Sequence, residues 1–194
     1  MKTIYIERSS GRGRDGDWVE KLDLDGVDRI VVGTGPGSFA GIRSAIAFAQ
    51  GYALGRPCEV LGLPSPCAVA AKVYASEEGC QRLAVVGDAR CGKLWIAVFN
   101  GFNLERDVFQ VDKAEIASAV GSLSGGAYRV VTPDQERIGG LLEEAFGGRQ
   151  TGGQTPRYMG GQTPDADGLR LFAEANPAIL KPEPLPIYLN PAVR

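Results

Sequence analysis

Residues 33–43 read GTGPGSFAGIR, and this stretch decides how the first half of the chain folds. It follows an apolar run, Arg29-Ile-Val-Val, which is typical of a buried strand, and it leads into small residues with helical spacing. Gly35, Pro36 and Gly37 predict a tight turn between the strand and the helix, with a backbone that another group can approach closely. Amide N–H groups at such a helix start can face an anion or a protein surface.

Two kinds of glycine-rich loop bind phosphates and resemble this stretch. The GxxxxGK[ST] loop needs a lysine that reaches the phosphates, and the stretch contains none. The dinucleotide pattern G-x-G-x-x-A is matched by Gly35, Gly37 and Ala40, and it requires an acidic residue about 20 positions on, at the end of the next strand. Glu59 has roughly this spacing but begins its strand. A nucleotide- or dinucleotide-binding module or enzyme, and a turn without any ligand, both remain alternatives.

The helix expected from about Phe39 to Leu54 is apolar over most of its circumference, which predicts burial on two sides. A crossover helix between parallel strands would be covered by its own chain, whereas a helix at an interface would place one face against a second subunit. One stripe of the helix comprises Ile42, Ala45, Ile46, Ala49 and Ala53, and Phe48 and Tyr52 form a second apolar edge.

The remaining pattern alternates strands and helices, which favours an α/β layer structure. Strands are expected at residues 3–7, 17–24, 29–33, 59–62, 82–88, 93–100, 109–111 and 128–132, the first two joined as a hairpin arm. Further helices are expected at residues 65–75, 114–120, 134–146 and 166–175. The motif GGQTP occurs at residues 152–156 and 160–164, so the segment 147–168 is expected to be a loop. The proline-rich tail is expected to pack back on the fold.

Composition excludes several classes of chemistry. The chain has no histidine, so it can build neither a Ser-His-Asp nor a Cys-His nucleophile. Its four cysteines form no CxxC pair, and neither a metal nor another cofactor is expected. A net charge of −2 argues against independent binding of nucleic acid. With no apolar segment typical of a signal or a membrane span, a cytoplasmic protein without membrane contact is expected.

Motifs in four places, taken in order, resemble the TsaB (YeaZ) family of the bacterial machinery that makes threonylcarbamoyladenosine in tRNA. The strongest is GPGSFAGIR at residues 35–43, where the usual sequence in the family is GPGSFTGLR. Weaker matches are Leu63-Pro-Ser65, the GDAR stretch at residues 87–90 with the strand 93–98, and PLPIYLNP at residues 184–191. Near the N-terminus, Glu7 and Arg8 stand where the family has Asp and Thr, and residues 10–28 leave hardly any room for the family's next helix.

The resemblance implies an α/β fold of the degenerate actin-like (ASKHA, ribonuclease H-like) type, with two lobes and a truncated N-terminal lobe. Residues 1–80 would form that first lobe and carry the GPGSF helix, and residues 81–194 would form the second lobe with the loop 147–168. In this superfamily, nucleotide chemistry needs an early Asp and a phosphate hairpin at the first strand. This chain has Glu7 and Arg8 at that place, so ATP hydrolysis is not expected here. Asp88 and Arg90 are explained by a polar hairpin turn.

By the same resemblance, the chain would be a non-catalytic accessory subunit for threonylcarbamoyladenosine modification of tRNA. Its partners would be a TsaD-type catalytic subunit and a TsaE-type ATPase, with a homodimer as an alternative and tRNA contacted only indirectly. TsaD holds its metal with a pair of histidines, which this chain lacks. The expected partner interface comprises the turn Gly35, Pro36 and Gly37, the cap Ser38, the aromatic anchor Phe39, the rim residue Arg43 and the contact face Ile42, Ala45, Ile46 and Ala49.

Overall fold

The computed structural model describes residues 1–10, 18–124, 126, 128–148 and 155–189. The chain divides into two compact units, one made of residues 1–68 and 164–188 and the other of residues 69–163 and 189–194. These units differ from the expected lobes 1–80 and 81–194, because residues 164–188 return to the first unit. The division falls within helix α2, Ser65–Ser76.

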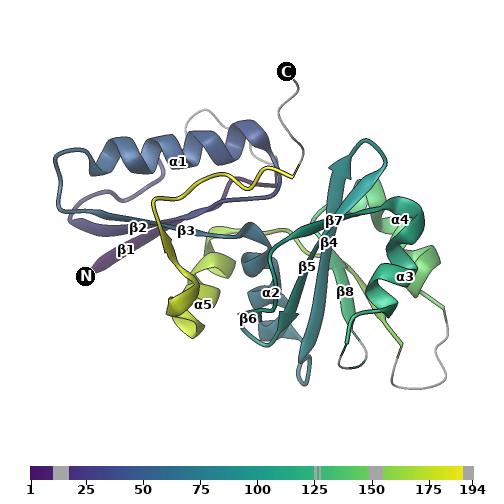
Figure 1. Ribbon diagram of the computed structural model, residues 1–194. Helices are drawn as coiled ribbons and strands as arrows, with labels where there is room; N and C mark the ends of the chain where they lie inside the picture. The colour runs from purple at the N-terminus through teal and green to yellow at the C-terminus, as the bar shows by residue number, and fades with distance from the viewer. Residues whose placement is uncertain (11–17, 125, 127, 149–154, 190–194) are drawn as a thin grey trace. The chain divides into compact units, whose positions relative to one another are not determined.

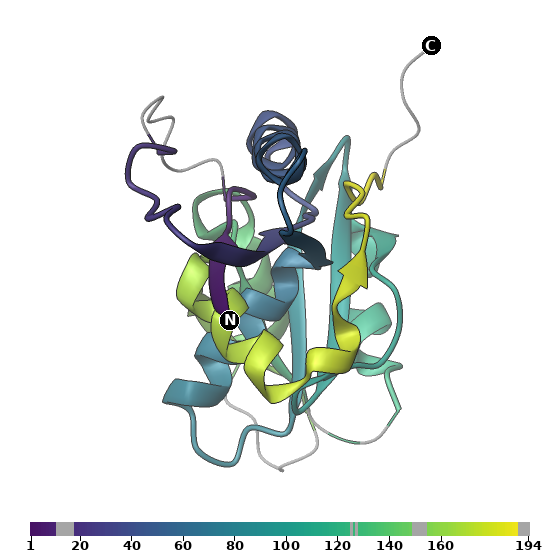
Figure 2. The same cartoon turned by 90° about the vertical axis from the view of Figure 1, so that its left-hand side faces the viewer.

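The first unit is built on a sheet with strand order β1-β2-β3-β10. Strands β1 (Lys2–Ile6), β2 (Val27–Gly33) and β3 (Glu59–Leu63) are parallel, and β10 (Lys181–Pro182) is antiparallel to β3. Helix α1 (Phe39–Ala53) and helix α5 (Ala166–Ala175) lie on opposite faces of this sheet, as Figures 1 and 2 show from two directions. A short 3-10 helix, Pro177–Ile179, follows α5.

Coverage of both faces explains the apolar run in β2. Ile30, Val31 and Val32 are consecutive and all fully buried, as expected for a strand inside a parallel sheet rather than at a water-exposed face. The core between the sheet and α1 contains Ile6, Val27, Ile30, Val32, Ile42, Ala45, Ile46 and Ala49.

The expected strand at residues 17–24 is wrong over the described residues 18–24, which form turns. Trp18 and Leu22, four positions apart, both pack against the core of the first unit, and the Leu22 N–H donates to the Val19 carbonyl at 3.0 Å. This i to i+3 hydrogen bond folds the chain back on itself, which an extended strand does not allow. Strand β1 pairs in parallel with β2 instead.

The second unit has a sheet with strand order β6-β5-β4-β8-β9, and β7 pairs with β5. The predicted hairpin is confirmed as β4 (Arg82–Arg90) and β5 (Lys93–Asn100). The other strands are β6 (Asn103–Leu104), β7 (Phe109–Asp112), β8 (Arg129–Thr132) and β9 (Arg157–Gly161). The helices are the 3-10 turn Lys113–Glu115, α3 (Ile116–Gly121) and α4 (Gln135–Phe146).

Strand β9 corrects the prediction that residues 147–168 form only a loop. It pairs in parallel with β8 at the edge of the sheet, with an irregular register between Val130 and Thr132. Gly160 has φ +98°, and glycine within a strand often marks a bulge, which agrees with this irregular register. The first GGQTP copy lies largely outside the described residues, and the second begins at the end of β9.

The C-terminal tail packs back on the first unit, as predicted. Pro184 is buried and lies against Gly62 of β3, and the Ile187 N–H donates to the Thr34 carbonyl at 2.8 Å. Among the helices described, none has the length and apolar character to cross a membrane. Of the four cysteines, Cys67 is buried and Cys91 is exposed.

Candidate partner-binding surface

The turn between β2 and α1 takes the conformation that its glycines predict. Gly35 has φ +87°, a value that residues with a Cβ atom rarely adopt, and the Gly35–Pro36 peptide bond is cis. The turn is fixed to the start of α2 by two hydrogen bonds. The Gly35 N–H donates to Ser65 Oγ at 3.0 Å, and the Ser65 N–H donates to the Gly35 carbonyl at 2.9 Å.

The close backbone approach expected at the glycines is present, and the approaching group belongs to the chain itself. The Ser38 N–H donates to the Ser9 carbonyl at 2.7 Å. A Cβ on Gly37 would come 2.7 Å from Ser9 Cβ, and a Cβ on Gly41 would come under 3.0 Å from the Arg8 carbonyl oxygen. The segment after β1 therefore occupies the space that the glycines leave open.

This packing argues against a phosphate at the turn. The N–H groups of Gly35, Ser38 and Gly41 donate to Ser65 Oγ, the Ser9 carbonyl and Ser38 Oγ, so they do not point at an open anion site. Glu59, the acidic residue of the dinucleotide pattern, begins β3 and accepts from Arg29 Nε at 2.7 Å. It thus lies at the opposite end of the strands from the turn.

Ser38 is the N-cap of α1, as predicted. Its backbone is extended, and its Oγ accepts a hydrogen bond from the Gly41 N–H at 3.3 Å. A hydroxyl in this position satisfies one of the amides that the first helical turn leaves without a partner. The cap sets where α1 begins and so places Phe39, the first helical residue, at the surface.

The predicted contact face of α1 needs correction. Ile42, Ala45, Ile46 and Ala49 are between 0% and 6% exposed and pack in the core of the first unit. Their stripe faces the sheet because a crossover helix must bury its apolar side against the strands that it connects. A partner cannot contact these side chains while the helix stays packed on its sheet.

The opposite face of α1 is exposed in the described chain. It carries Ala40, Arg43, Ser44, Ala47 and Gly51, which recur at helical spacing, and its small residues leave the helix backbone accessible. The sequence predicts burial of α1 on two sides, but the described part of the chain buries only one of them.

An aromatic cluster stands at the N-terminal end of this face. Phe39 is 58% exposed and Tyr188 is 56% exposed, and their ring centroids lie 5.8 Å apart. The Arg43 guanidinium lies over the Phe39 ring at 4.9 Å, where the negative face of the ring attracts a cation. Arg43, the predicted rim residue, thus contacts the predicted anchor Phe39 through the face of its ring.

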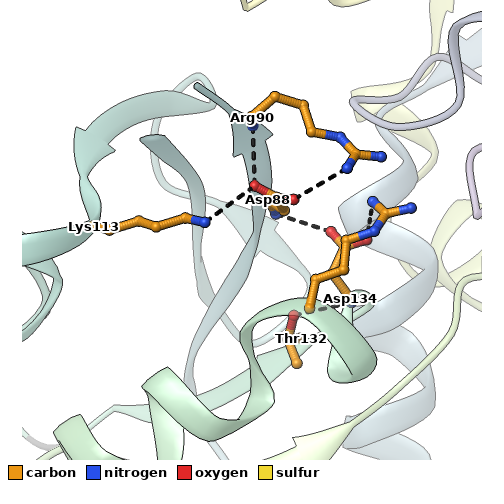
Figure 3. A network of polar contacts seen from close by, with 6 residues as sticks. Asp88, Arg90, Lys113, Thr132 and Asp134 are labelled. Carbon is orange, nitrogen blue, oxygen red and sulfur yellow. Dashed lines mark hydrogen bonds and ion pairs between the residues drawn. The ribbon is translucent and has the colours of Figure 1, made fainter. Parts of the chain in front are cut away.

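A second polar cluster, shown in Figure 3, lies at the ends of β4 and β8. The Asp88 carboxylate accepts from the Arg90 N–H at 3.0 Å and lies 3.8 Å from Lys113 Nζ. The Asp88 N–H donates to Asp134 Oδ2 at 2.9 Å, and the Asp134 N–H donates to Thr132 Oγ1 at 3.0 Å. Arg90 has φ +69°, which its hydrogen bond to Asp88 helps to hold. These contacts support the explanation of Asp88 and Arg90 as a polar hairpin turn.

Comparison with known proteins gives matches at three levels. A family model described as TsaD, tRNA N6-adenosine threonylcarbamoyltransferase, matches residues 20–137, more than half of the chain. The Escherichia coli (strain K12) tRNA threonylcarbamoyladenosine biosynthesis protein TsaB is 31% identical over 129 residues, which are 61% of this chain and 55% of that protein. The chain thus spans only about half the length of this curated relative.

Solved structures agree with this at the level of the fold. YeaZ from Pseudomonas aeruginosa superposes with a TM-score of 0.67 at 20% identity, over 96% of this chain and 99% of that one. Another Pseudomonas aeruginosa structure, described as similar to the peptidase YeaZ, gives a TM-score of 0.61 at 22% identity, over 84% and 74% of the two chains. The predicted α/β fold of the degenerate actin-like type is confirmed, the chain is similar to TsaB (YeaZ) proteins, and it belongs to the family that the TsaD model describes.

Proposed function

We propose that this chain is a non-catalytic accessory subunit in the synthesis of threonylcarbamoyladenosine in tRNA. It would dock a TsaD-type catalytic subunit, with a TsaE-type ATPase completing the machinery and tRNA contacted only through the partners. The observation that carries the proposal is the match to TsaB, a protein named for this biosynthesis, combined with an exposed face on the helix that contains the GPGSF motif.

The chemistry of the exposed face supports docking of a protein. Phe39 and Tyr188 form an exposed aromatic pair, and Arg43 adds a charged edge. Aromatic and arginine side chains are the residue types that most often dominate binding energy at protein interfaces. The small residues Ala40 and Ala47 would let a partner helix approach α1 closely.

The absence of histidine from the sequence supports the accessory role. The matched family model carries the name of a transferase, and the resemblance attributes to TsaD a metal held by a histidine pair. This chain has no residue of that type to offer. Catalysis would therefore come from the partner, and this chain would supply a surface.

Co-purification with a TsaD-type subunit tests the docking. We expect Ala47→Arg, in the middle of the exposed face of α1, to abolish the complex because a long charged side chain would stand in the contact. The matched control is Ala117→Arg, which makes the same change at an exposed position of α3 in the other unit. Equal binding by the wild type and Ala47→Arg, or no binding by the wild type in any nucleotide state, would refute the proposed interface.

The biological role has a separate readout. Loss of the gene should remove threonylcarbamoyladenosine from the tRNA of the host, and the wild-type sequence should restore it. Restoration by Ala117→Arg but not by Ala47→Arg would link the modification to the α1 face. A host whose modification is unchanged by the loss would contradict the role, whatever the docking experiment gives.

A further inference from the structure

Glu7 lies directly after β1, beside the turn that begins α1, and its carboxyl group is buried. Its Oε1 accepts a hydrogen bond from the Ser9 N–H at 2.6 Å. Its Oε2 is excluded from solvent and has no hydrogen-bond partner in the described part of the chain. Ionising a carboxyl group with one oxygen in this condition is costly, because neither water nor a donor compensates the charge on that oxygen.

The space around Oε2 is closed. It exists because Gly33, the last residue of β2, has no side chain: a Cβ there would collide with the Glu7 carboxyl group and come 2.9 Å from Ser65 Oγ. Ser65 is itself 2% exposed, and its Oγ accepts from the Gly35 N–H. The carboxyl group of Glu7 thus lies where the ends of β1 and β2, the start of α2 and the glycine turn meet.

The charged and titratable groups around Glu7 offer no cation to the carboxylate. From α2 it faces the Cys67 thiol, whose pKa is raised well above its usual value by burial and further by the charge of Glu7. From its own segment comes Arg8, whose guanidinium lies over the Trp18 ring at 5.0 Å. Gly33 and the glycine turn contribute no titratable group. Among the described residues, no basic side chain contributes to the pKa shift of Glu7.

Burial raises the pKa of Glu7 above its ordinary value of 4.5, and hydrogen bonding, chiefly from Ser9, opposes this only in part. The folded state therefore binds the proton more tightly than the unfolded state does. By linkage, the stability that depends on this proton is fully present below pH 4.5. This stability decreases as the pH rises from 4.5 through the folded-state pKa, and at higher pH it no longer changes.

We propose that Glu7 is a proton-dependent latch for the turn that begins α1. With a neutral carboxyl group, the ends of β1 and β2, the turn at Gly35 and the start of α2 stay packed as described. When Glu7 loses its proton, a charge appears where neither water nor a cation can compensate it, and the turn opens. Because the turn positions Phe39, opening would disturb the exposed aromatic cluster, but the latch itself is a property of the isolated chain.

Amide hydrogen exchange at Gly35 in the isolated chain tests the latch. After correction for the intrinsic exchange rate, we expect its opening equilibrium to increase by up to tenfold for each pH unit between 4.5 and the folded-state pKa, and then to level off. In Glu7→Gln, which keeps the shape and removes the titration, protection at Gly35 should not depend on pH. Glu78→Gln, at an exposed position, is the matched control and should behave as the wild type.

Two results would overturn the proposal: wild-type protection at Gly35 that is constant with pH, or a pH dependence that Glu7→Gln retains. If Glu7→Gln fails to fold, the carboxyl carbon of Glu7 in the wild type can be titrated by NMR. A midpoint above 4.5 supports the latch, and one at or below 4.5 refutes it. Neither measurement involves a partner, so the docking proposal is tested separately.

Discussion

Alanine at Gly41 and alanine at Gly51 should change the stability of the first unit in opposite directions, although both positions lie in α1. In a helix interior, replacing glycine by alanine is intrinsically favourable because alanine loses less backbone conformational entropy than glycine when the chain folds. The structure places different surroundings at the two positions. A Cβ on Gly51 would meet nothing within 4 Å, whereas one on Gly41 would come under 3.0 Å from the Arg8 carbonyl oxygen.

The magnitudes follow from these surroundings. Gly51→Ala keeps the intrinsic gain and should raise the free energy of unfolding by about 0.5–1 kcal/mol. Gly41→Ala has the same gain, but the colliding atom is backbone and cannot rotate away. Forcing a methyl group into such a closed contact costs about 1–3 kcal/mol. The net effect should be a loss of up to about 2.5 kcal/mol, with the segment after β1 pushed away from the helix.

Urea denaturation gives the stability of both variants, and native-state hydrogen exchange of the α1 amides assigns the change to the first unit. Gly41→Ala should lower protection along α1, and Gly51→Ala should increase it. If Gly41→Ala proves as stable as Gly51→Ala, the segment after β1 does not pack on the helix as described, and the account of the glycine turn fails with it.

Two further predictions concern single polar contacts. Asp88→Ala removes the acceptor of the Arg90 N–H and should lower the free energy of unfolding of the second unit by about 1–3 kcal/mol in a urea titration. The control Asp112→Ala breaks an exposed ion pair and should lower it by under about 1 kcal/mol in the same titration. Similar losses for both would show that Asp88 does not hold the hairpin. Ser38→Ala should lower the free energy of unfolding by about 1 kcal/mol through loss of the N-cap, whereas Ser38→Asp keeps a capping oxygen and should not. Hydrogen-exchange protection of the first α1 amides measures the difference. Equal protection in the two variants would contradict the prediction.

Local patterns predicted most of the fold because they reflect local physics. The buried strand before Gly33, the cap at Ser38 and the β4–β5 hairpin each follow from hydrophobic spacing or turn residues, and all three are present. Strand β9 was missed because its glycines indicate a loop, and only pairing with the distant strand β8 makes it regular. Such tertiary support leaves no local signal in the sequence.

The candidate site was predicted only in part for a similar reason. Helical spacing correctly placed Ile42, Ala45 and Ala49 on one stripe, but spacing alone does not say whether a stripe faces its own sheet or a partner. The contact of Phe39 with Tyr188 joins positions 149 residues apart in the chain, and no periodicity relates them. Nor could the burial of the Glu7 carboxyl group be inferred, because it depends on the missing side chain of Gly33.

The return of residues 164–188 to the first unit has a consequence for how the protein is made. The second unit consists almost entirely of one continuous stretch, residues 69–163, so it can fold while later residues are still being synthesised. The first unit must wait, because β10 and α5 complete it only after they leave the ribosome. Until then its nascent sheet exposes the edge of β3 and one apolar face, and unpaired edges and apolar surface of this kind favour aggregation.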